Sequence, residues 1–391
     1  MLRGTAKTKH SIHALVAAGL WWVLLGQGTV LWSTEDTGQG SGQGPPQVTS
    51  KAAGPRVRGM NGPDQQGGGK PKRRGVVKIA TIGCGPASVA AGAEPQEVVD
   101  KMIAHWRGRL DQVLPDKPDL IVVPEACDRP GGFGAEQLRR YYHVRQDQVQ
   151  RFFADVAKEN KCYIVYSAYR EMPDGTRRNS SVLIDRKGDV VGIYNKNHPT
   201  IGEIEQGTLC GKDAPIFECD FGRVAMAICF DLNFDELRLK YVKGKPDLLI
   251  FSSMYHGGLM QAYWAYSCRC HFVGAIAGRA TPSQIYNPLG EVVASTTNYF
   301  DFAVATVNLD CALAHLDYNG QRLRRLKAKY GPKVKITDPG RLGAVLIASE
   351  HETISVDDMI REFEIEPLDD YFTRALAHHH KPQNIEKGEE K

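Results

Sequence analysis

The chain has 391 residues, of which 42% are hydrophobic and 24% are charged, a composition typical of a globular protein with one large or two modest domains. Its formal net charge is only +4, and the basic residues are scattered along the chain. The composition therefore predicts no nucleic-acid-binding surface.

Residues 1–32 differ from the rest of the chain. Three basic residues within the first nine precede an apolar run from Ala14 to Leu25, a pattern typical of an export signal. If residues 26–32 are added, the apolar span is just long enough for an uncleaved membrane anchor, and no clear Ala-x-Ala site decides between the two. We therefore expect residues 1–32 to be a signal peptide or a single signal anchor. The protein is then expected to be exported or membrane-anchored, outside the cytoplasm.

The next segment, residues 33–75, is rich in Gly, Gln, Pro and Ser and poor in large apolar residues. Such a segment buries too little surface to offset its ordering entropy, so it is predicted to be a flexible linker.

The nine cysteines are odd in number and show neither a small-domain disulfide framework nor a Cys-x2-Cys pair. We expect no metal site, because the three histidines at 378–380 fit a solvated tail better than a ligand set.

Apolar strands alternate with amphipathic helices from Val76 onward. In the first half of this region the patterns predict strands at 76–82 and 119–123, helices at 95–113 and 135–160, and hairpin-linked strands at 162–169, 181–184 and 190–194. After a strand that ends at Cys229, they predict helices at 234–242 and 260–270 and strands at 247–252, 272–278, 284–286, 291–294 and 303–308. This alternation indicates an α/β domain with mixed sheets and helices outside, over residues 76–310. Residues 311–391 are predicted to be a C-terminal extension with a basic helix at 321–330, either an appendage or an arm for oligomer contacts.

Three polar residues each follow an apolar strand: Glu125, Lys196 and Cys229. In open α/β sheets, ligands collect outside the carboxyl ends of strands. Singly, each residue could be structural: a helix-capping acid, a surface lysine and a small core thiol. Together they supply what acyl transfer from an amide needs, namely a thiol nucleophile, a carboxylate base and an ammonium group that stabilises an oxyanion.

The local sequences around these residues resemble the motifs of the nitrilase superfamily of carbon–nitrogen hydrolases. The matching stretches are VVPEA at 122–126, YNKNHPT at 194–200 and AICFDLNFDEL at 227–237, and the resemblance extends over about Val76 to Asp310. It implies a four-layer α-β-β-α sandwich, usually a homodimer or a higher homo-oligomer, that works without a metal or an organic cofactor.

The resemblance also implies a role for each site residue. Glu125 is the expected general base, Lys196 and the backbone N–H of Phe230 the expected oxyanion donors, and Cys229 the expected nucleophile. A supporting glutamate is expected at Glu203, with Glu205 as the fallback.

The substrate is less constrained than the chemistry. Nitrile-hydrolysing members usually have Trp-Glu after the nucleophile, and Phe230-Asp231 here favours a small amide or carbamoyl amine. Aromatic and polar groups near strand ends commonly shape such pockets, although core packing explains them as well. The candidate substrate-binding residues are Phe133, Phe230, Tyr255, His256 and Trp264.

Three alternative functions remain open on the sequence. Nitrile hydrolysis and N-acyltransfer would use the same thioester. A non-catalytic ligand-binding scaffold would keep the fold without the chemistry, and a uniquely fast-alkylating Cys229 would exclude it.

Overall fold

The structure is a computed structural model that describes residues 75–278 and 281–388, all within one compact unit, Gly69–Lys391. The predicted signal or anchor segment, and the predicted linker except for Gly75, lie outside the described residues. Within the described ranges, no helix has the length and apolar character needed to span a membrane.

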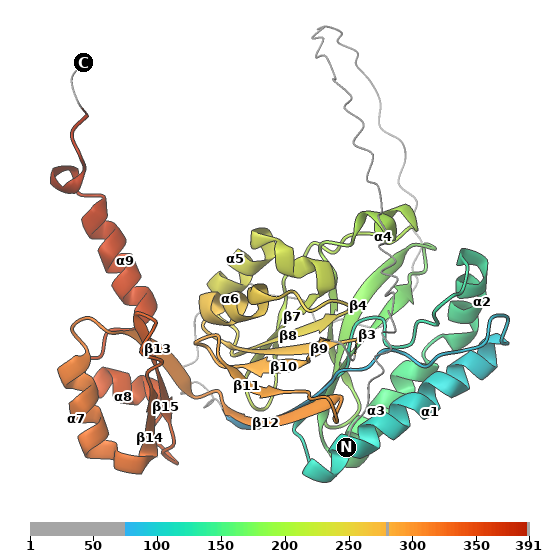
Figure 1. Cartoon of the computed structure of the whole chain (residues 1–391), viewed down its shortest axis with the longest axis horizontal. Helices are drawn as coiled ribbons and strands as arrows, with labels where there is room; N and C mark the ends of the chain where they lie inside the picture. The colour runs from blue at the N-terminus through green and yellow to red at the C-terminus, as the bar shows by residue number, and fades with distance from the viewer. Residues whose placement is uncertain (1–74, 279–280, 389–391) are drawn as a thin grey trace, which may run out of the picture. The chain divides into compact units, whose positions relative to one another are not determined.

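Two six-stranded sheets form the centre of the molecule (Figure 1). The first sheet has the order β12-β1-β2-β3-β4-β5. In it, β1, β2 and β3 run parallel, and β12, β4 and β5 pair antiparallel to their neighbours. Its strands are β1 (Val76–Ile82), β2 (Leu120–Val122), β3 (Tyr163–Glu171), β4 (Arg177–Ile184), β5 (Val190–Asn195) and β12 (Phe302–Asn308).

The second sheet has the order β11-β10-β9-β8-β7-β6, with β7, β8 and β9 parallel. Its strands are β6 (Ile216–Glu218), β7 (Arg223–Ile228), β8 (Leu248–Ser253), β9 (His271–Ile276), β10 (Gln284–Tyr286) and β11 (Val292–Ser295). Two buried hydroxyls join the sheets: Thr81 donates to the Gly274 carbonyl at 2.9 Å, and Ser252 donates to the Val123 carbonyl at 2.9 Å.

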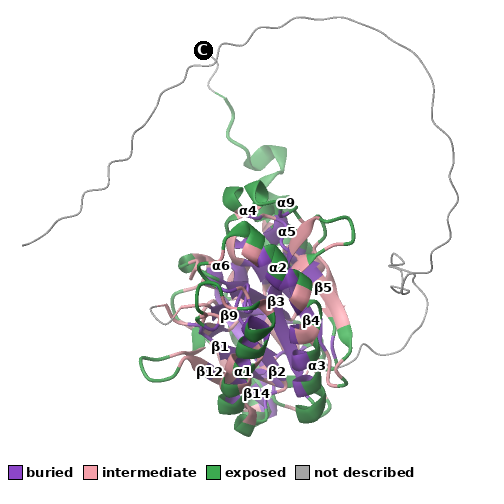
Figure 2. Ribbon diagram, turned by 90° about the vertical axis from the view of Figure 1, so that its right-hand side faces the viewer, coloured by how far each residue is buried: buried purple, intermediate pink, exposed green. Residues whose placement is uncertain are grey.

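Helices cover the outer face of each sheet, so that the domain has four layers. Alternation along β1 shows the arrangement: Val77 and Ile79 belong to the core shared with the second sheet, whereas Ala80 and Ile82 belong to the core under the helices. In Figure 2 the strands are buried and the outer helix faces are exposed. The helices are α1 (Pro95–Val113), α2 (Ala135–Arg145) and α3 (Gln148–Asn160) beside the first sheet, and α5 (Asp235–Gly244) and α6 (Leu259–Cys268) beside the second. The predicted α-β-β-α sandwich is confirmed.

The single helix predicted over 135–160 is wrong, because the chain forms two helices there. The break falls at Gln146, which has a φ of 44°. Arg145, the last residue of α2, points inward and pairs with the buried carboxylate of Asp128 at 2.8 Å. A tertiary ion pair fixes this break. The sequence therefore needs no Gly or Pro there and gives no local signal of it.

The C-terminal extension folds as a small α/β appendage with its own hydrophobic core. Its antiparallel sheet has the order β13-β15-β14, and the Ser349 N–H donates to the Asp310 carbonyl at 2.9 Å where the appendage meets the sandwich. Its elements are β13 (Cys311–His315), α7 (Gly320–Tyr330), β14 (Val334–Thr337), β15 (Ala344–Ser349), α8 (Val356–Glu362) and α9 (Leu368–His379).

Candidate active site

The candidate nucleophile sits on a sharp turn. Strand β7 ends at Ile228, and a 3-10 turn over Cys229–Asn233 follows directly. Cys229 has a φ of 48°, which L-residues other than Asn and Gly rarely adopt. Backbone strain of this kind persists only where the surrounding structure enforces it, and it clusters at functional sites.

The buried carboxylate of Asp231 holds this turn. Its Oδ2 accepts hydrogen bonds from the Ile228 N–H at 2.9 Å and the Tyr194 hydroxyl at 2.6 Å. Its Oδ1 accepts the His198 N–H at 2.8 Å. Since Tyr194 and His198 flank Lys196, one carboxylate fixes the nucleophile turn against the loop that carries the lysine.

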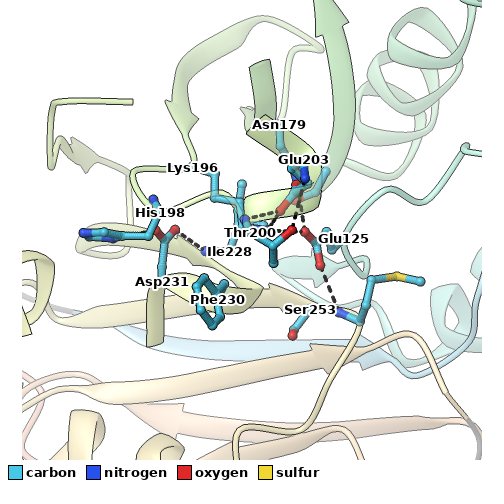
Figure 3. Close-up of polar contacts among 12 residues, drawn as sticks. Glu125, Asn179, Lys196, His198, Thr200, Glu203, Ile228, Phe230, Asp231 and Ser253 are labelled. Carbon is cyan, nitrogen blue, oxygen red and sulfur yellow. Dashed lines mark hydrogen bonds and ion pairs between the residues drawn. The ribbon is translucent and has the colours of Figure 1, made fainter. Parts of the chain in front are cut away.

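Lys196 lies between two glutamates. It directly follows β5, and its side chain is 1% exposed. Its Nζ donates to Glu125 Oε1 at 2.9 Å and to Glu203 Oε2 at 2.7 Å (Figure 3). The three groups, distant in sequence, therefore form one charged cluster beside Cys229, whose thiol is close enough to Glu125 for that carboxylate to raise its pKa.

Helix-capping chemistry positions Glu203. Thr200 is the N-cap of the short helix α4 (Ile201–Glu205), and its Oγ1 accepts the Glu203 N–H at 3.3 Å. In return, Glu203 Oε2 accepts the Thr200 N–H at 2.8 Å, which completes a capping box. Glu205, the fallback in the sequence prediction, is exposed, and none of its contacts within the described residues is with Lys196.

Two further groups hold the glutamates, and the sequence analysis did not identify either. Asn179 on β4 is 1% exposed, and its Nδ2 donates to Glu125 Oε1 at 2.7 Å and to Glu203 Oε1 at 2.9 Å. The Met254 N–H donates to Glu125 Oε2 at 3.0 Å. Asn179 lies in the polar run from Arg177 to Ser181 that opens β4 before its apolar residues, and this run is the only signal in the sequence that points to it. Nothing in the sequence marks a backbone N–H.

The electrostatics of the cluster favour a protonated thiol and a charged lysine. Burial, and then the negative charge of Glu125, raises the pKa of Cys229 to about 12. Burial also opposes ionisation of Lys196 and Glu203, but the charges of Glu125 and Glu203 prevail at Lys196, and the charge of Lys196 with several hydrogen bonds prevails at Glu203. The pKa of Lys196 is therefore raised, and that of Glu203 is lowered to about 2. At neutral pH the site holds a neutral thiol against a carboxylate, with a fixed positive charge beside them.

Three of the predicted pocket residues directly follow, in the sequence, a residue of this cluster or one that donates to it. Phe230 follows Cys229 and is half-buried. Tyr255 and His256 follow the Met254 N–H, and the Tyr255 hydroxyl accepts a hydrogen bond from Asn233 at 2.9 Å on the nucleophile turn. Their contact with a substrate stays a prediction.

The other two predicted pocket residues are not brought to the thiol. Trp264 is fully buried in the core under α6, so it packs in the interior instead of facing a substrate. Phe133 lies on the wall of a separate cavity of about 620 Å³, together with Arg129 and Glu205. Within residues 75–278 and 281–388, no three His, Cys, Asp or Glu side chains group as a metal site requires.

Comparison with known proteins gives a consistent family. The "Nitrilase homolog 2" of Dictyostelium discoideum is 23% identical over 260 residues, which is 60% of this chain and 76% of the relative. The "Deaminated glutathione amidase" of Mus musculus is 25% identical over 219 residues, 49% of this chain and 68% of the relative. Among solved structures, an amidase from Nesterenkonia sp. matches with a TM-score of 0.52 at 16% identity, covering 66% of this chain and 99% of that one, which shows the shared fold.

The family model described as "Carbon-nitrogen hydrolase" matches residues 78–315, more than half of the chain. The similar proteins include amidases, and one of the solved amidase structures is described as belonging to the nitrilase superfamily. The chain therefore belongs to the carbon–nitrogen hydrolases and is an amidase-like enzyme of the nitrilase superfamily.

Proposed function

We propose that this enzyme hydrolyses a non-peptide C–N bond of a small amide or carbamoyl amine through a thioester on Cys229. The observation that carries the proposal is the buried cluster in which Lys196 contacts both Glu125 and Glu203, beside the strained Cys229. A buried charge cluster of this kind needs compensation to exist, and its position beside a strained thiol gives it a chemical use.

The first half of the reaction forms the acyl-enzyme. Glu125 takes the thiol proton as Cys229 Sγ attacks the amide carbonyl carbon. Lys196 and the backbone N–H of Phe230 stabilise the tetrahedral oxyanion. Glu125 then returns the proton to the nitrogen, the C–N bond breaks, and ammonia or an amine leaves.

The second half releases the acid. Glu125 removes a proton from a water molecule that attacks the thioester carbonyl, and the same oxyanion donors stabilise the second intermediate. The C–S bond breaks and Cys229 recovers its proton. Overall, one water is consumed and one acid and one amine are formed.

The high pKa of Cys229 agrees with this order of events. A thiol with a pKa of about 12 is almost fully protonated at neutral pH, so it must lose its proton during attack rather than before it. The acceptor must then come within hydrogen-bond reach during the reaction, and Glu125 is the carboxylate whose charge acts most strongly on the thiol.

Glu203 is proposed to act through Lys196. It accepts hydrogen bonds from Lys196, Thr200, Asn179 and Tyr169, so its two oxygens are fully engaged by protein donors. A glutamate so engaged holds the ammonium in place and has no oxygen left for substrate.

The test is a substrate panel on the full chain: short amides, carbamoyl amines and nitriles, with ammonia release measured and the acyl-enzyme detected by intact mass. Cys229→Ala is the control variant. We expect ammonia and an acyl adduct from amides or carbamoyl amines, and neither from the control.

Each alternative predicts a different result. Turnover of nitriles alone would indicate a nitrilase. An acyl adduct that decays only when an amine acceptor is added would indicate N-acyltransfer. Ammonia release that survives in Cys229→Ala would refute the proposed nucleophile. A Cys229 thiol that is alkylated no faster than the other thiols, with no adduct from any compound, would indicate a binding scaffold.

A further inference from the structure

A second cavity, of about 330 Å³, lies between α2, α3 and β3. None of the proposed catalytic residues lines it. Its wall combines buried and exposed polar side chains with a few apolar ones: Asp128, Tyr142, His143, Arg145, Gln146, Asp147, Val149, Gln150, Tyr166, Ala168, Arg170 and Glu171.

Two buried polar atoms on this wall have no hydrogen-bond partner within the described part of the chain. They are Oδ1 of Asp128, a residue 1% exposed, and the hydroxyl of Tyr142, a residue 3% exposed. Burying a polar group without a partner is costly, and most such groups in native proteins are satisfied by protein, water or ligand. The wall is therefore incomplete by itself.

The unpartnered carboxylate oxygen belongs to a rigid structure. Arg145 Nη1 donates to the other oxygen of Asp128 at 2.8 Å, and Nη2 donates to the Tyr169 carbonyl at 2.7 Å. The same guanidinium lies over the Tyr142 ring, 4.9 Å from its centroid. Asp128 is thus held in place, and its other oxygen is a buried acceptor without a partner in the described part of the chain.

Arg170 places a positively charged guanidinium on the same cavity wall as the Asp128 carboxylate. It is half-buried, and it forms no ion pair with any carboxylate in residues 75–278 and 281–388. Its charged neighbours include Arg145 and Arg178, and burial together with these cations lowers its pKa. A carboxylate placed beside Arg170 would relieve this repulsion.

The other charges on the wall limit the ligand further. Asp147 and Glu171 are exposed carboxylates at the rim, so the wall has three carboxylates against two guanidiniums. This balance disfavours a multiply charged anion such as phosphate. A volume of about 330 Å³ equals about ten waters of the liquid, enough for one small organic molecule.

We propose that this cavity binds a small zwitterion of the α-amino acid class. The ammonium group donates to Asp128 Oδ1 and to the Tyr142 hydroxyl, and the carboxylate pairs with Arg170. The proposal does not depend on the proposed hydrolysis.

The cavity is nevertheless connected to the proposed catalytic cluster. Arg145 donates to the Tyr169 carbonyl, and the Tyr169 hydroxyl donates to Glu203 Oε1 at 2.8 Å. A ligand that shifts Arg145 therefore acts on a direct neighbour of Glu203.

The test is calorimetric titration of the full-length Cys229→Ala variant, which separates binding from turnover. The zwitterions are glycine, L-alanine and L-serine. The matched probes are acetate, which lacks the cation, methylammonium, which lacks the anion, and glycine betaine, which lacks N–H donors. We expect saturable binding of at least one zwitterion and binding at least tenfold weaker for each matched probe. The charge-assisted contacts at both ends are the physical reason.

Variants locate the site. Arg170→Gln and the near-isosteric Tyr142→Phe should each weaken zwitterion binding, the first by tenfold or more. Arg139→Gln, an exposed residue of α2 that does not line this cavity, should leave it unchanged.

Three results would each overturn the proposal. One is the absence of saturable binding by every zwitterion up to about 10 mM, which would mean that the cavity holds only water. Another is acetate or methylammonium binding as tightly as the zwitterion. The third is binding that Arg170→Gln leaves intact.

Discussion

Replacing Glu203 with glutamine tests the charged cluster most directly. The four hydrogen-bond partners of this carboxylate are all donors: Lys196 at 2.7 Å and the Thr200 N–H at 2.8 Å on Oε2, and Asn179 at 2.9 Å and the Tyr169 hydroxyl at 2.8 Å on Oε1. A glutamine can accept at one end only, so its NH2 group must face two donors.

The expected cost follows from the better of the two orientations. With the amide nitrogen toward Tyr169, the phenol can rotate and accept, and only one N–H of Asn179, which keeps its bond to Glu125, is left without an acceptor. One buried unsatisfied donor costs about 1–3 kcal/mol. Exchanging a charged acceptor of Lys196 for a neutral one costs about 1 kcal/mol more. Because Lys196 keeps Glu125 at 2.9 Å, the total stays below the cost of an orphaned buried charge. We expect the free energy of unfolding to fall by about 2–4 kcal/mol.

The assay is urea unfolding at neutral pH, with the slope against urea as a check that the transition is unchanged. Turnover should fall by about tenfold to a hundredfold as the lysine loses its fixed position. Glu205→Gln is the matched control, since Glu205 lies two residues away, is exposed and should change neither quantity. If Glu203→Gln stays within about 0.5 kcal/mol of the parent protein and keeps its activity, the cluster does not hold Lys196 as argued.

Three further outcomes are expected. The negative charge of Glu125 is the second cause, next to burial, of the raised pKa of Cys229, and Glu125→Gln removes it. Iodoacetamide should therefore alkylate Cys229 faster in this variant at about pH 9, while amide hydrolysis should fall by about 10²–10⁴. Slower alkylation would contradict this. Asp231→Asn replaces a buried acceptor of several donors, so unfolding in urea should show a loss of about 2–4 kcal/mol, and an unchanged midpoint would mean that the nucleophile turn is held elsewhere. Despite burial, Lys196 lowers the pKa of Glu203 to about 2, below its ordinary 4.5, so the unfolded chain takes up this proton first as the pH falls. The stability that this group contributes is therefore present above about pH 4.5 and declines toward about pH 2. In Glu203→Gln, the unfolding free energy plotted against pH should lack this part of the decline. An identical slope in the variant and the parent protein would show that Glu203 is not the titrating group.

The interpretation of the site depends on a distinction between residues that react and residues that hold. Cys229, Glu125 and Lys196 are proposed to touch the substrate. Glu203 and Asp231 are fully engaged by protein donors, so they are positioning residues. This distinction predicts that variants of the second group lose stability together with rate, whereas Cys229→Ala loses rate alone.

The sequence by itself determined the α/β class and the order of most elements in residues 76–310, and the resemblance of its motifs implied the four layers. Strand 76–82 and helix 95–113 have the predicted bounds, because local hydrophobic period and Pro95 at the helix start specify them. The three short motifs also identified the residues that the structure brings into one cluster. Periodicity and motif order are local properties, and a single chain carries them without reference to its folded partners.

Only the tertiary structure decided which groups complete the site. Asn179 lies 54 residues from Glu125, and the Met254 N–H lies 129 residues from it, yet both donate to its carboxylate. The break at Gln146 and the interior position of Trp264 were likewise set by packing between distant segments. The hydrogen-bond partners and the burial of a residue depend on which other strands and helices pack against it. The residue's neighbours in the sequence do not predict these contacts.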